Sequence, residues 1–244
     1  MPMREAPPID PKLKAAIDAA IEKEHLVRIR AYAVISATEA GLSYIVESIL
    51  KRYNREDMLG PVYTSVKELS LNGAKANFKR ILFEDENINT EDDGDYERGM
   101  EMFKNQLNEH MVLEYGKKSK ERKLYVDIFF DFNTDRLIVE VLNNRPISQK
   151  EDKRIREKFH TAMRYDDIAQ FYMEGGDSSE GAGMGIVLVT MMLKAQQIDP
   201  HLFTIRSDYR EKTLARVEFP LHGDYQPNRQ RFITESNAEL VLSV

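Results

Sequence analysis

Two groups of residues in this chain of 244 residues have types and spacings suited to binding a phosphorylated ligand. The first is the stretch 174–189, EGGDSSEGAGMGIVLV, in which five glycines precede an apolar run at helical spacing. Glycines let the backbone approach a ligand closely, and the N–H groups that open a helix attract an anion. A polyphosphate is therefore the favoured ligand, and a flexible Gly/Ser linker is the alternative.

The glycine stretch does not fit two familiar phosphate-binding motifs. A Walker loop ends in Gly-Lys-Ser/Thr, whereas Gly185 is followed by Ile186 and Val187. The dinucleotide fingerprint directly follows a buried strand, whereas the preceding residues 166–174, DDIAQFYME, are typical of a loop or short helix. Residues elsewhere in the chain must therefore identify the site.

The second group lies in the segment 62–83, whose periodicity predicts a helix. Its expected apolar face comprises Val62, Val66, Leu69, Gly73 and Ala76, and a separate polar line comprises Glu68, Asn72, Lys75 and Lys79. A surface helix can carry such a line without any function. However, a glycine inside a helix costs about 1 kcal/mol, so Gly73 predicts the close approach of another element or of a ligand.

Composition excludes several classes of function. The formal net charge of −6 disfavours nucleic-acid binding, and the chain has no cysteine for disulfides, thiolate metal sites or a cysteine nucleophile. No apolar run approaches membrane-spanning length, and the N-terminus is too charged and proline-rich for a signal peptide. We therefore expect a cytoplasmic globular protein that does not associate with membranes.

Hydrophobic periodicity then gives the elements that would position these residues. It predicts helices at 12–23, 38–53, 62–83, 97–115, 149–164 and from the glycine stretch to about 196, and strands at 26–35, 124–130, 136–142, 202–206 and 214–219. The expected fold is an α/β two-layer sandwich, with one mixed, mainly antiparallel sheet and helices on one face.

The expected domain organisation has three parts. An N-terminal extension with a short helix covers 1–25, the main domain covers 26–221, and a polar tail covers 222–244. Residues 84–123 are predicted to be an insertion that begins with an acidic turn segment and ends with a basic loop at 116–123. The insertion and the apolar end of the tail, 240–244, are candidate docking surfaces.

The motifs and their order resemble the GHKL ATPase family, which includes histidine kinases, gyrase-type ATPases and anti-sigma-factor serine kinases. The segment 68–75, ELSLNGAK, resembles the family's N box, and 181–186, GAGMGI, resembles its G2 box. The segment 212–220 resembles the closing Gly-Thr strand, with Lys212 where glycine is usual. The resemblance covers about residues 26–84 and 124–221 and implies the Bergerat-type ATP-binding fold.

This resemblance implies ATP and Mg²⁺ as cofactors and assigns roles to matching residues. Asn72 would offer an oxygen to Mg²⁺, Glu68 would be the general base, and Lys75 would reach a phosphate. Residues 148–180 would be the ATP lid. The remaining nucleotide-binding residues would be Gly181, Gly183, Met184 and Gly185 at the phosphates, and Thr213 on the closing strand.

The chain departs from the family at the turn that should recognise adenine. The family's G1 box is Asp-x-Gly-x-Gly, whereas residues 143–147 read Asn-Asn-Arg-Pro-Ile. Asn143 can accept a hydrogen bond from the adenine amino group, but without charge, and its amide could instead flip and donate. Whether the site prefers adenine to guanine is therefore left open. The alternative interpretation is that residues 143–147 form an ordinary turn.

These features predict a cytoplasmic ATP-binding regulatory protein with Mg-dependent protein kinase or ATPase activity on a partner protein. None of the five histidines has the sequence context of a phosphoacceptor, and the layout is closest to anti-sigma-factor serine kinases and histidine kinase catalytic domains. A non-catalytic, nucleotide-switched interaction module is the alternative, and a scaffold that binds no nucleotide is a third hypothesis. The partner, the phosphoacceptor and the existence of a homodimer are left open.

Overall fold

The computed structural model of the protein describes residues 9–165, 168–173 and 184–231. It contains a five-stranded sheet in the order β1-β2-β3-β5-β4. The strands are β1 (Val27–Ala31), β2 (Val126–Phe132), β3 (Arg136–Asn143), β4 (Phe203–Ser207) and β5 (Thr213–Pro220). All four pairings between these strands are antiparallel, so the expectation of a mixed sheet is wrong. The expected two-layer α/β architecture is confirmed.

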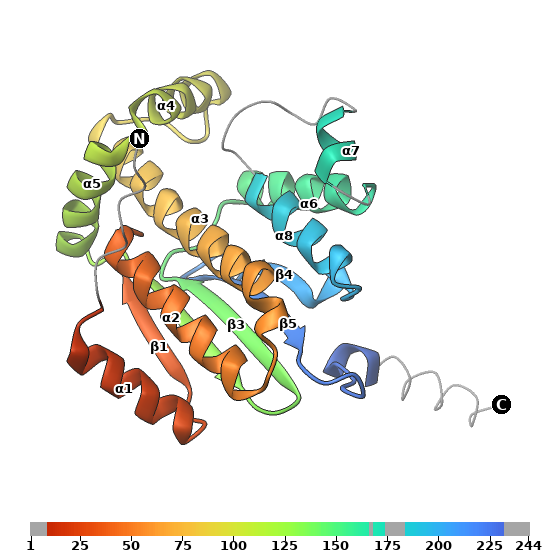
Figure 1. Cartoon of the computed structure of the whole chain (residues 1–244). Coiled ribbons are helices and arrows are strands. Elements are labelled where there is room, and N and C mark those ends of the chain that lie inside the picture. Colours follow the sequence, from red (N-terminus) through yellow and green to blue (C-terminus); the bar gives the residue numbers. More distant parts are fainter. Residues whose placement is uncertain (1–8, 166–167, 174–183, 232–244) are drawn as a thin grey trace.

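Helices α2, α3 and α8 cover one face of this sheet (Figure 1). The helices are α1 (Pro11–Glu22), α2 (Ser36–Arg52), α3 (Leu59–Asp85), α4 (Asp93–Gln106), α5 (Glu109–Glu121), α6 (Gln149–Met163), α7 (Ile168–Met173) and α8 (Met184–Ala195), with short 3-10 helices η1 (Glu56–Met58) and η2 (Pro200–Leu202). The predicted helices at 12–23, 38–53, 62–83 and 149–164 are therefore confirmed, and the predicted strand at 26–35 is shorter than expected.

The main core lies between the sheet and its helices. Alternate residues of the central strand β3, Leu137, Val139 and Val141, are buried against the helices together with Ile128 and Val217 from the neighbouring strands. Because side chains alternate along a strand, the next residue in this series, Asn143, also faces the helical layer. The alternation of side chains along β3 thus places the polar residue Asn143 on the face that the helices cover.

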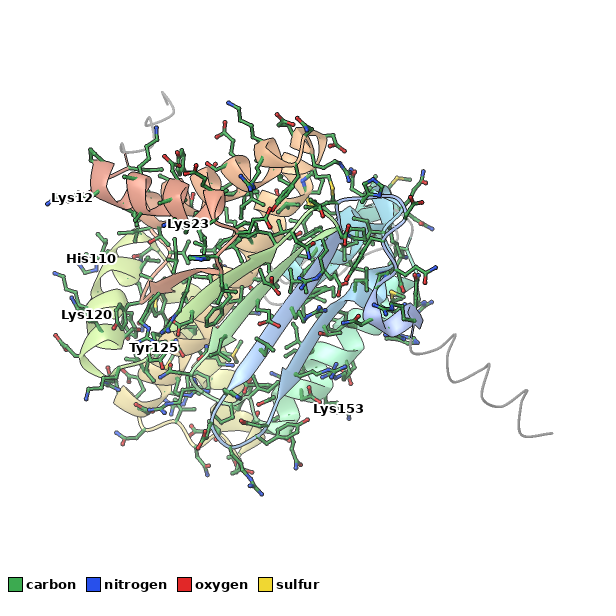
Figure 2. All side chains as sticks on the ribbon, turned by 90° about the horizontal axis from the view of Figure 1, so that it is seen from below. Lys12, Lys23, His110, Lys120, Tyr125 and Lys153 are labelled. Carbon is green, nitrogen blue, oxygen red and sulfur yellow. The ribbon has the colours of Figure 1, made fainter. Side chains whose placement is uncertain are left out.

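The opposite face of the sheet carries charged and aromatic side chains. Figure 2 looks onto this face, and none of the helices α1 to α8 lies across it. Asp127, which is buried, pairs with Arg28 at 2.8 Å and with Arg30 at 2.8 Å, and the Arg30 guanidinium lies 3.6 Å from the ring centre of Tyr125. These contacts allow a carboxylate to sit in the sheet without being left unpaired.

Helix α3 is the long element on which the candidate site is built. Its apolar positions Val62, Val66 and Leu69 are buried as expected. In its later half Ala74 and Phe78 are buried and Ala76 is only half-buried, so the prediction that Ala76 lies on the buried face is wrong. The glycine at position 73 has a structural reason, because a β-carbon at that position would lie 3.0 Å from a methyl group of Val126 on β2. The predicted close approach of another element is confirmed.

The predicted insertion 84–123 contains two helices rather than one helix and a loop. The side chain of Asn108 accepts a hydrogen bond from the N–H of Met111 and begins α5, so the predicted helix at 97–115 is broken there. The predicted basic loop at 116–123 is wrong, because most of it forms the last turns of α5. Both helices pack on the C-terminal half of α3 through a second apolar cluster that includes Phe78, Tyr96, Phe103 and Tyr115.

The N-terminal helix α1 packs on the main domain. Ile17 and Ile21 are buried in the main core, against α2 and β1. Asp10 begins the helix by accepting hydrogen bonds from the N–H groups of Lys12 and Leu13. The described part of the predicted extension is therefore continuous with the main core.

Candidate functional site

The start of α8 lies directly against the polar line of α3. A β-carbon at Gly185 would lie 2.9 Å from Oε2 of Glu68 and 2.7 Å from Nδ2 of Asn72. Contacts this short exclude any side chain at position 185 unless the two polar groups move. The glycine at the beginning of the helix thus lets an acid and an amide, one helical turn apart on α3, lie beside the N-terminal end of α8.

Glu68 and Asn72 are half-buried, and within the described part of the chain neither side chain forms a hydrogen bond or ion pair. Lys75, one turn further along α3, is also half-buried and makes no ion pair with a described residue. Lys79, in contrast, forms an ion pair with Glu151 of α6. Three residues of the predicted polar line thus have polar groups without a described hydrogen-bond or ion-pair partner. The fourth, Lys79, binds the neighbouring helix α6.

The glycine stretch is only partly described. Gly181 and Gly183 lie outside the described residues. Two parts of the predicted ATP lid 148–180, residues 166–167 and 174–180, also lie outside them. Met184 begins α8 and packs on a small apolar cluster formed by Ala162 of α6, Phe171 of α7, and Val187 and Met191 of α8. On its other side α8 contributes Ile186, Val189 and Leu193 to the main core. The position of Gly185 is thus fixed by apolar contacts on two sides of the helix.

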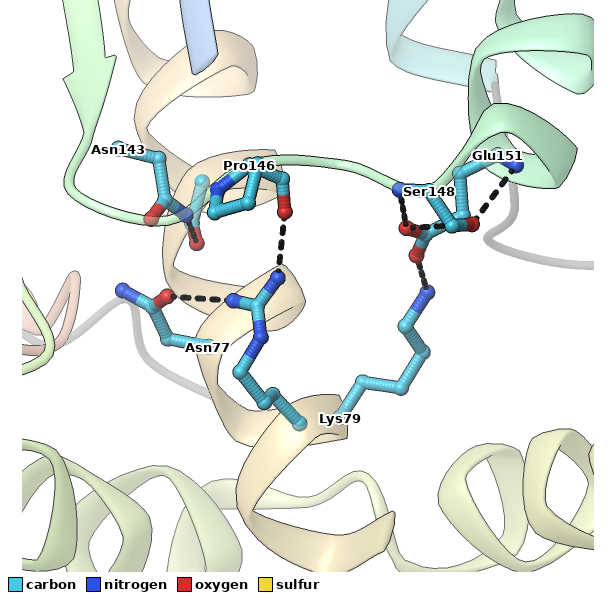
Figure 3. A network of polar contacts seen from close by, with 8 residues as sticks. Asn77, Lys79, Asn143, Pro146, Ser148 and Glu151 are labelled. Carbon is cyan, nitrogen blue, oxygen red and sulfur yellow. Dashed lines mark hydrogen bonds and ion pairs between the residues drawn. The ribbon is translucent and has the colours of Figure 1, made fainter. Parts of the chain in front are cut away.

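Asn143 approaches the same part of α3 from the end of β3. Its Nδ2 donates a hydrogen bond of 2.9 Å to the carbonyl oxygen of Gly73, the residue that follows Asn72 (Figure 3). The residue is 6% exposed, and its Oδ1 is buried without a hydrogen-bond partner in the described structure. Because only the N–H₂ end can donate to a carbonyl, this bond fixes the amide and leaves an acceptor, not a donor, unused.

The turn 143–147 is held by side-chain hydrogen bonds along its length. Asn144 accepts from the N–H of Tyr125 and donates to the carbonyl of Lys123, both at 2.8 Å. The hydroxyl of Thr213 donates to the carbonyl of Arg145 at 3.0 Å, and the N–H of Ile147 donates to the Ser207 hydroxyl at 3.4 Å. Thr213, predicted to bind the nucleotide, therefore uses its hydroxyl to hold the turn.

Arg80 of α3 is a residue of this site that the sequence pattern missed. Its Nη2 donates to the carbonyl oxygen of Pro146 at 2.7 Å, and its Nη1 donates to Oδ1 of Asn77 at 3.4 Å (Figure 3). Burial lowers the pKa of the Arg80 guanidinium, and the charge of Arg145 adds to this effect. No local motif marks Arg80, because the carbonyl of Pro146 lies 66 residues away in the sequence and only the fold brings it to α3.

Helix α6, the first part of the predicted lid, is packed on the body of the protein. Glu151 closes a capping box with Ser148 and pairs with Lys79 (Figure 3). Burial opposes the charge of Glu151, but the charge and hydrogen bond of Lys79, the N–H of Ser148 and the charge of Arg80 together outweigh it, and the pKa of this carboxyl is lowered. Further along the helix, Arg156 donates to the carbonyl of Ile205 at 2.7 Å, and Phe159 packs on Phe203. Helix α6 is thus packed on the protein beside the turn 143–147.

Removing the Thr213 hydroxyl tests whether the turn depends on these hydrogen bonds. In Thr213→Val, the carbonyl of Arg145 loses its donor, and we expect the free energy of unfolding to fall by about 1 kcal/mol. This corresponds to a decrease of roughly 2–4 °C in melting temperature for a protein of this size. Thr204→Val on β4 is the control, because the Thr204 hydroxyl makes no hydrogen bond with the described residues. Equal melting temperatures of the two variants would contradict the prediction.

Comparisons with known proteins do not assign this chain to a family. An uncharacterized protein of Treponema pallidum (strain Nichols) is 28% identical over 210 residues, which cover 86% of this chain and 40% of that protein. The chain thus spans 40% of the length of this relative. No family model matches the chain, and no solved structure matches it. Among the helices of the described residues, none is long and apolar enough to cross a membrane.

Proposed function

We propose that this chain binds ATP with Mg²⁺ and is a regulatory protein with Mg-dependent kinase or ATPase activity on a partner protein. The observation that carries the proposal is the contact of Gly185 with Glu68 and Asn72. It brings the segments that resemble the G2 box and the N box into contact at the residues to which the resemblance gives roles. A Bergerat-type ATP-binding fold is part of the same proposal.

The donor set around Asn72 fits the way in which Mg²⁺ binds with a nucleotide. Within the described residues, no three His, Cys, Asp or Glu side chains come together as a metal site. The ion would therefore be held by the Asn72 amide oxygen together with phosphate oxygens and water, as is common for Mg²⁺. When bound, it would offset the negative charge of the phosphates. Glu68 carries a carboxylate without a described partner, which suits a general base for a water or a hydroxyl group.

The unpaired oxygen of Asn143 supports a preference for adenine. Adenine presents an amino group, which can donate to a buried acceptor, whereas the corresponding position of guanine is a carbonyl oxygen. Since Nδ2 of Asn143 is occupied by the Gly73 carbonyl, a guanine at this position would place two acceptors face to face. Because Oδ1 is buried, a base reaches it only after the side chains around it move, and this acceptor then favours ATP and ADP over GTP.

One observation favours the non-catalytic alternative. The turn 143–147 contains no glycine and departs from the family's G1 pattern. In that case the chain would be a nucleotide-switched interaction module, and Glu68 would be a structural residue.

The test combines binding with turnover. We expect Mg-ATP and Mg-ADP to raise the melting temperature more than Mg-GTP does, and Glu68→Gln to retain this shift while ATP turnover falls by about 100-fold or more. Glu47→Gln, on the exposed side of α2, is the control and should turn over ATP at the wild-type rate. Absence of any nucleotide-dependent shift would refute the proposal. A shift without turnover in the wild type would leave the interaction module as the function.

A further inference from the structure

Tyr96 of α4 lies among three cationic side chains from two other helices. The Nζ of Lys150 and the Cζ of Arg154, both on α6, lie 4.8 Å and 4.7 Å from the ring centre, and the Nζ of Lys79 on α3 lies 5.9 Å from it. Cations at such distances are attracted by the face of an aromatic ring. A single ring of the predicted insertion therefore contacts both α3 and α6.

The ring of Tyr96 is itself firmly held. It is 5% exposed and packs edge-on against Phe83, with 5.7 Å between the ring centres. Arg154 makes no ion pair with a described residue; it lies over the ring, and its charge also acts on Asp93. The contact between α4 and α6 thus includes a buried aromatic ring as well as exposed charges.

Ion pairs extend this contact to the first turn of α6. Asp93 of α4 pairs with Lys150, and Lys79 pairs with Glu151, which also closes the capping box with Ser148. Asp93 is largely exposed, so its pair with Lys150 adds little by itself. The capping residue Ser148 directly follows the turn 143–147. A continuous set of contacts therefore leads from α4 to the turn that carries Asn143.

We infer that Tyr96 is a positioning residue for α6. The insertion holds the first turn of α6, and through it the turn 143–147, in the arrangement that the proposed nucleotide site requires; this inference rests on the proposed function. A partner protein that displaces α4 would then change the affinity for the nucleotide without touching it, and bound nucleotide would change the affinity for that partner by the same factor.

The experiment compares two substitutions in the same apolar cluster of α4. Tyr96→Leu removes the ring among the cations, and Phe103→Leu removes a buried ring that has no cationic neighbour in the described structure. Hydrogen exchange of the amides at 149–156 and calorimetric affinity for Mg-ATP are measured on both full-length variants. We expect Tyr96→Leu to accelerate exchange in α6 and to weaken ATP binding by about 10-fold, and Phe103→Leu to leave both near wild type. Tyr96→Phe, which keeps the ring, should resemble the wild type.

The outcomes separate this inference from the proposed function. Equal effects of Tyr96→Leu and Phe103→Leu on exchange in α6 would overturn the inference, because general loosening of the cluster would then explain both. Faster exchange in Tyr96→Leu alone, with unchanged ATP affinity, would also overturn it. If the wild type binds no ATP, the proposed function fails, and the exchange comparison alone decides whether Tyr96 positions α6.

Discussion

Replacing Gly185 by alanine is expected to lower ATP turnover by about 100-fold or more while leaving the stability of the protein close to wild type. The added methyl group would lie 2.7–2.9 Å from the polar ends of Asn72 and Glu68. These ends are parts of side chains that can rotate away, so the helix packing survives but the two groups lose their positions. A displacement of about 1 Å in a reacting group can cost a factor of this size.

Steady-state turnover and melting temperature measured on the same preparation provide the check. Gly60→Ala is the matched control, since it also adds a methyl group in a helix, but no other atom lies within 4 Å of the new carbon. It should turn over ATP normally and be equally stable or slightly more stable. If Gly185→Ala turned over ATP at the wild-type rate, the proposed roles of Glu68 and Asn72 in turnover would be contradicted.

The second prediction concerns Asn143→Asp, which introduces the acidic residue that the GHKL pattern has at the corresponding position. We expect it to destabilise the protein by about 3 kcal/mol at neutral pH and to weaken ATP binding. The carboxylate cannot donate to the Gly73 carbonyl, so a buried negative charge would face an acceptor oxygen. The resemblance to the family alone would predict the opposite, namely better binding.

The pH dependence provides a specific check on this second variant. An unpaired buried carboxyl has a raised pKa in the folded state, so the variant should be closest to wild-type stability below the carboxyl's unfolded pKa and should lose stability as the pH rises above it. When it is protonated, the introduced carboxyl could again donate a hydrogen bond to the Gly73 carbonyl. Denaturant unfolding between pH 4 and pH 8 measures the difference, and Asn144→Asp, on a less buried side chain, should show a smaller one. Tighter ATP binding in Asn143→Asp would refute the explanation.

Much of the fold followed from the sequence because hydrophobic periodicity reports which face of each element is buried. The hairpin of β2 and β3, the helix that carries Glu68 and Asn72, and the helix after the glycine stretch were all predicted close to their observed positions. The contact of Gly185 with Glu68 and Asn72 is of the kind expected from the resemblance of their segments to the G2 and N boxes. These features depend on local residue patterns, which can be read from one sequence alone.

Other features could not be predicted because they depend on contacts between distant segments. The direction of the Asn143 amide is set by the carbonyl of Gly73, and the roles of Thr213 and Arg80 are set by strand register and by the turn they hold. The break between α4 and α5 was missed because apolar residues continue at helical spacing across Asn108. Tyr96 gave no signal of its own, since only the fold brings its three cationic neighbours together.

If the chain binds a nucleotide as proposed, the hydrogen-bonded turn 143–147 affects how fast the nucleotide exchanges. Asparagine, arginine and proline have fewer backbone conformations to lose than glycine, and side chains from α3, β4 and β5 hold this turn by hydrogen bonds. Docking of the base should then require little ordering of the backbone of this turn, and release should not wait for that backbone to rearrange. The lifetime of a bound nucleotide would instead be set on the phosphate side, near the start of α8.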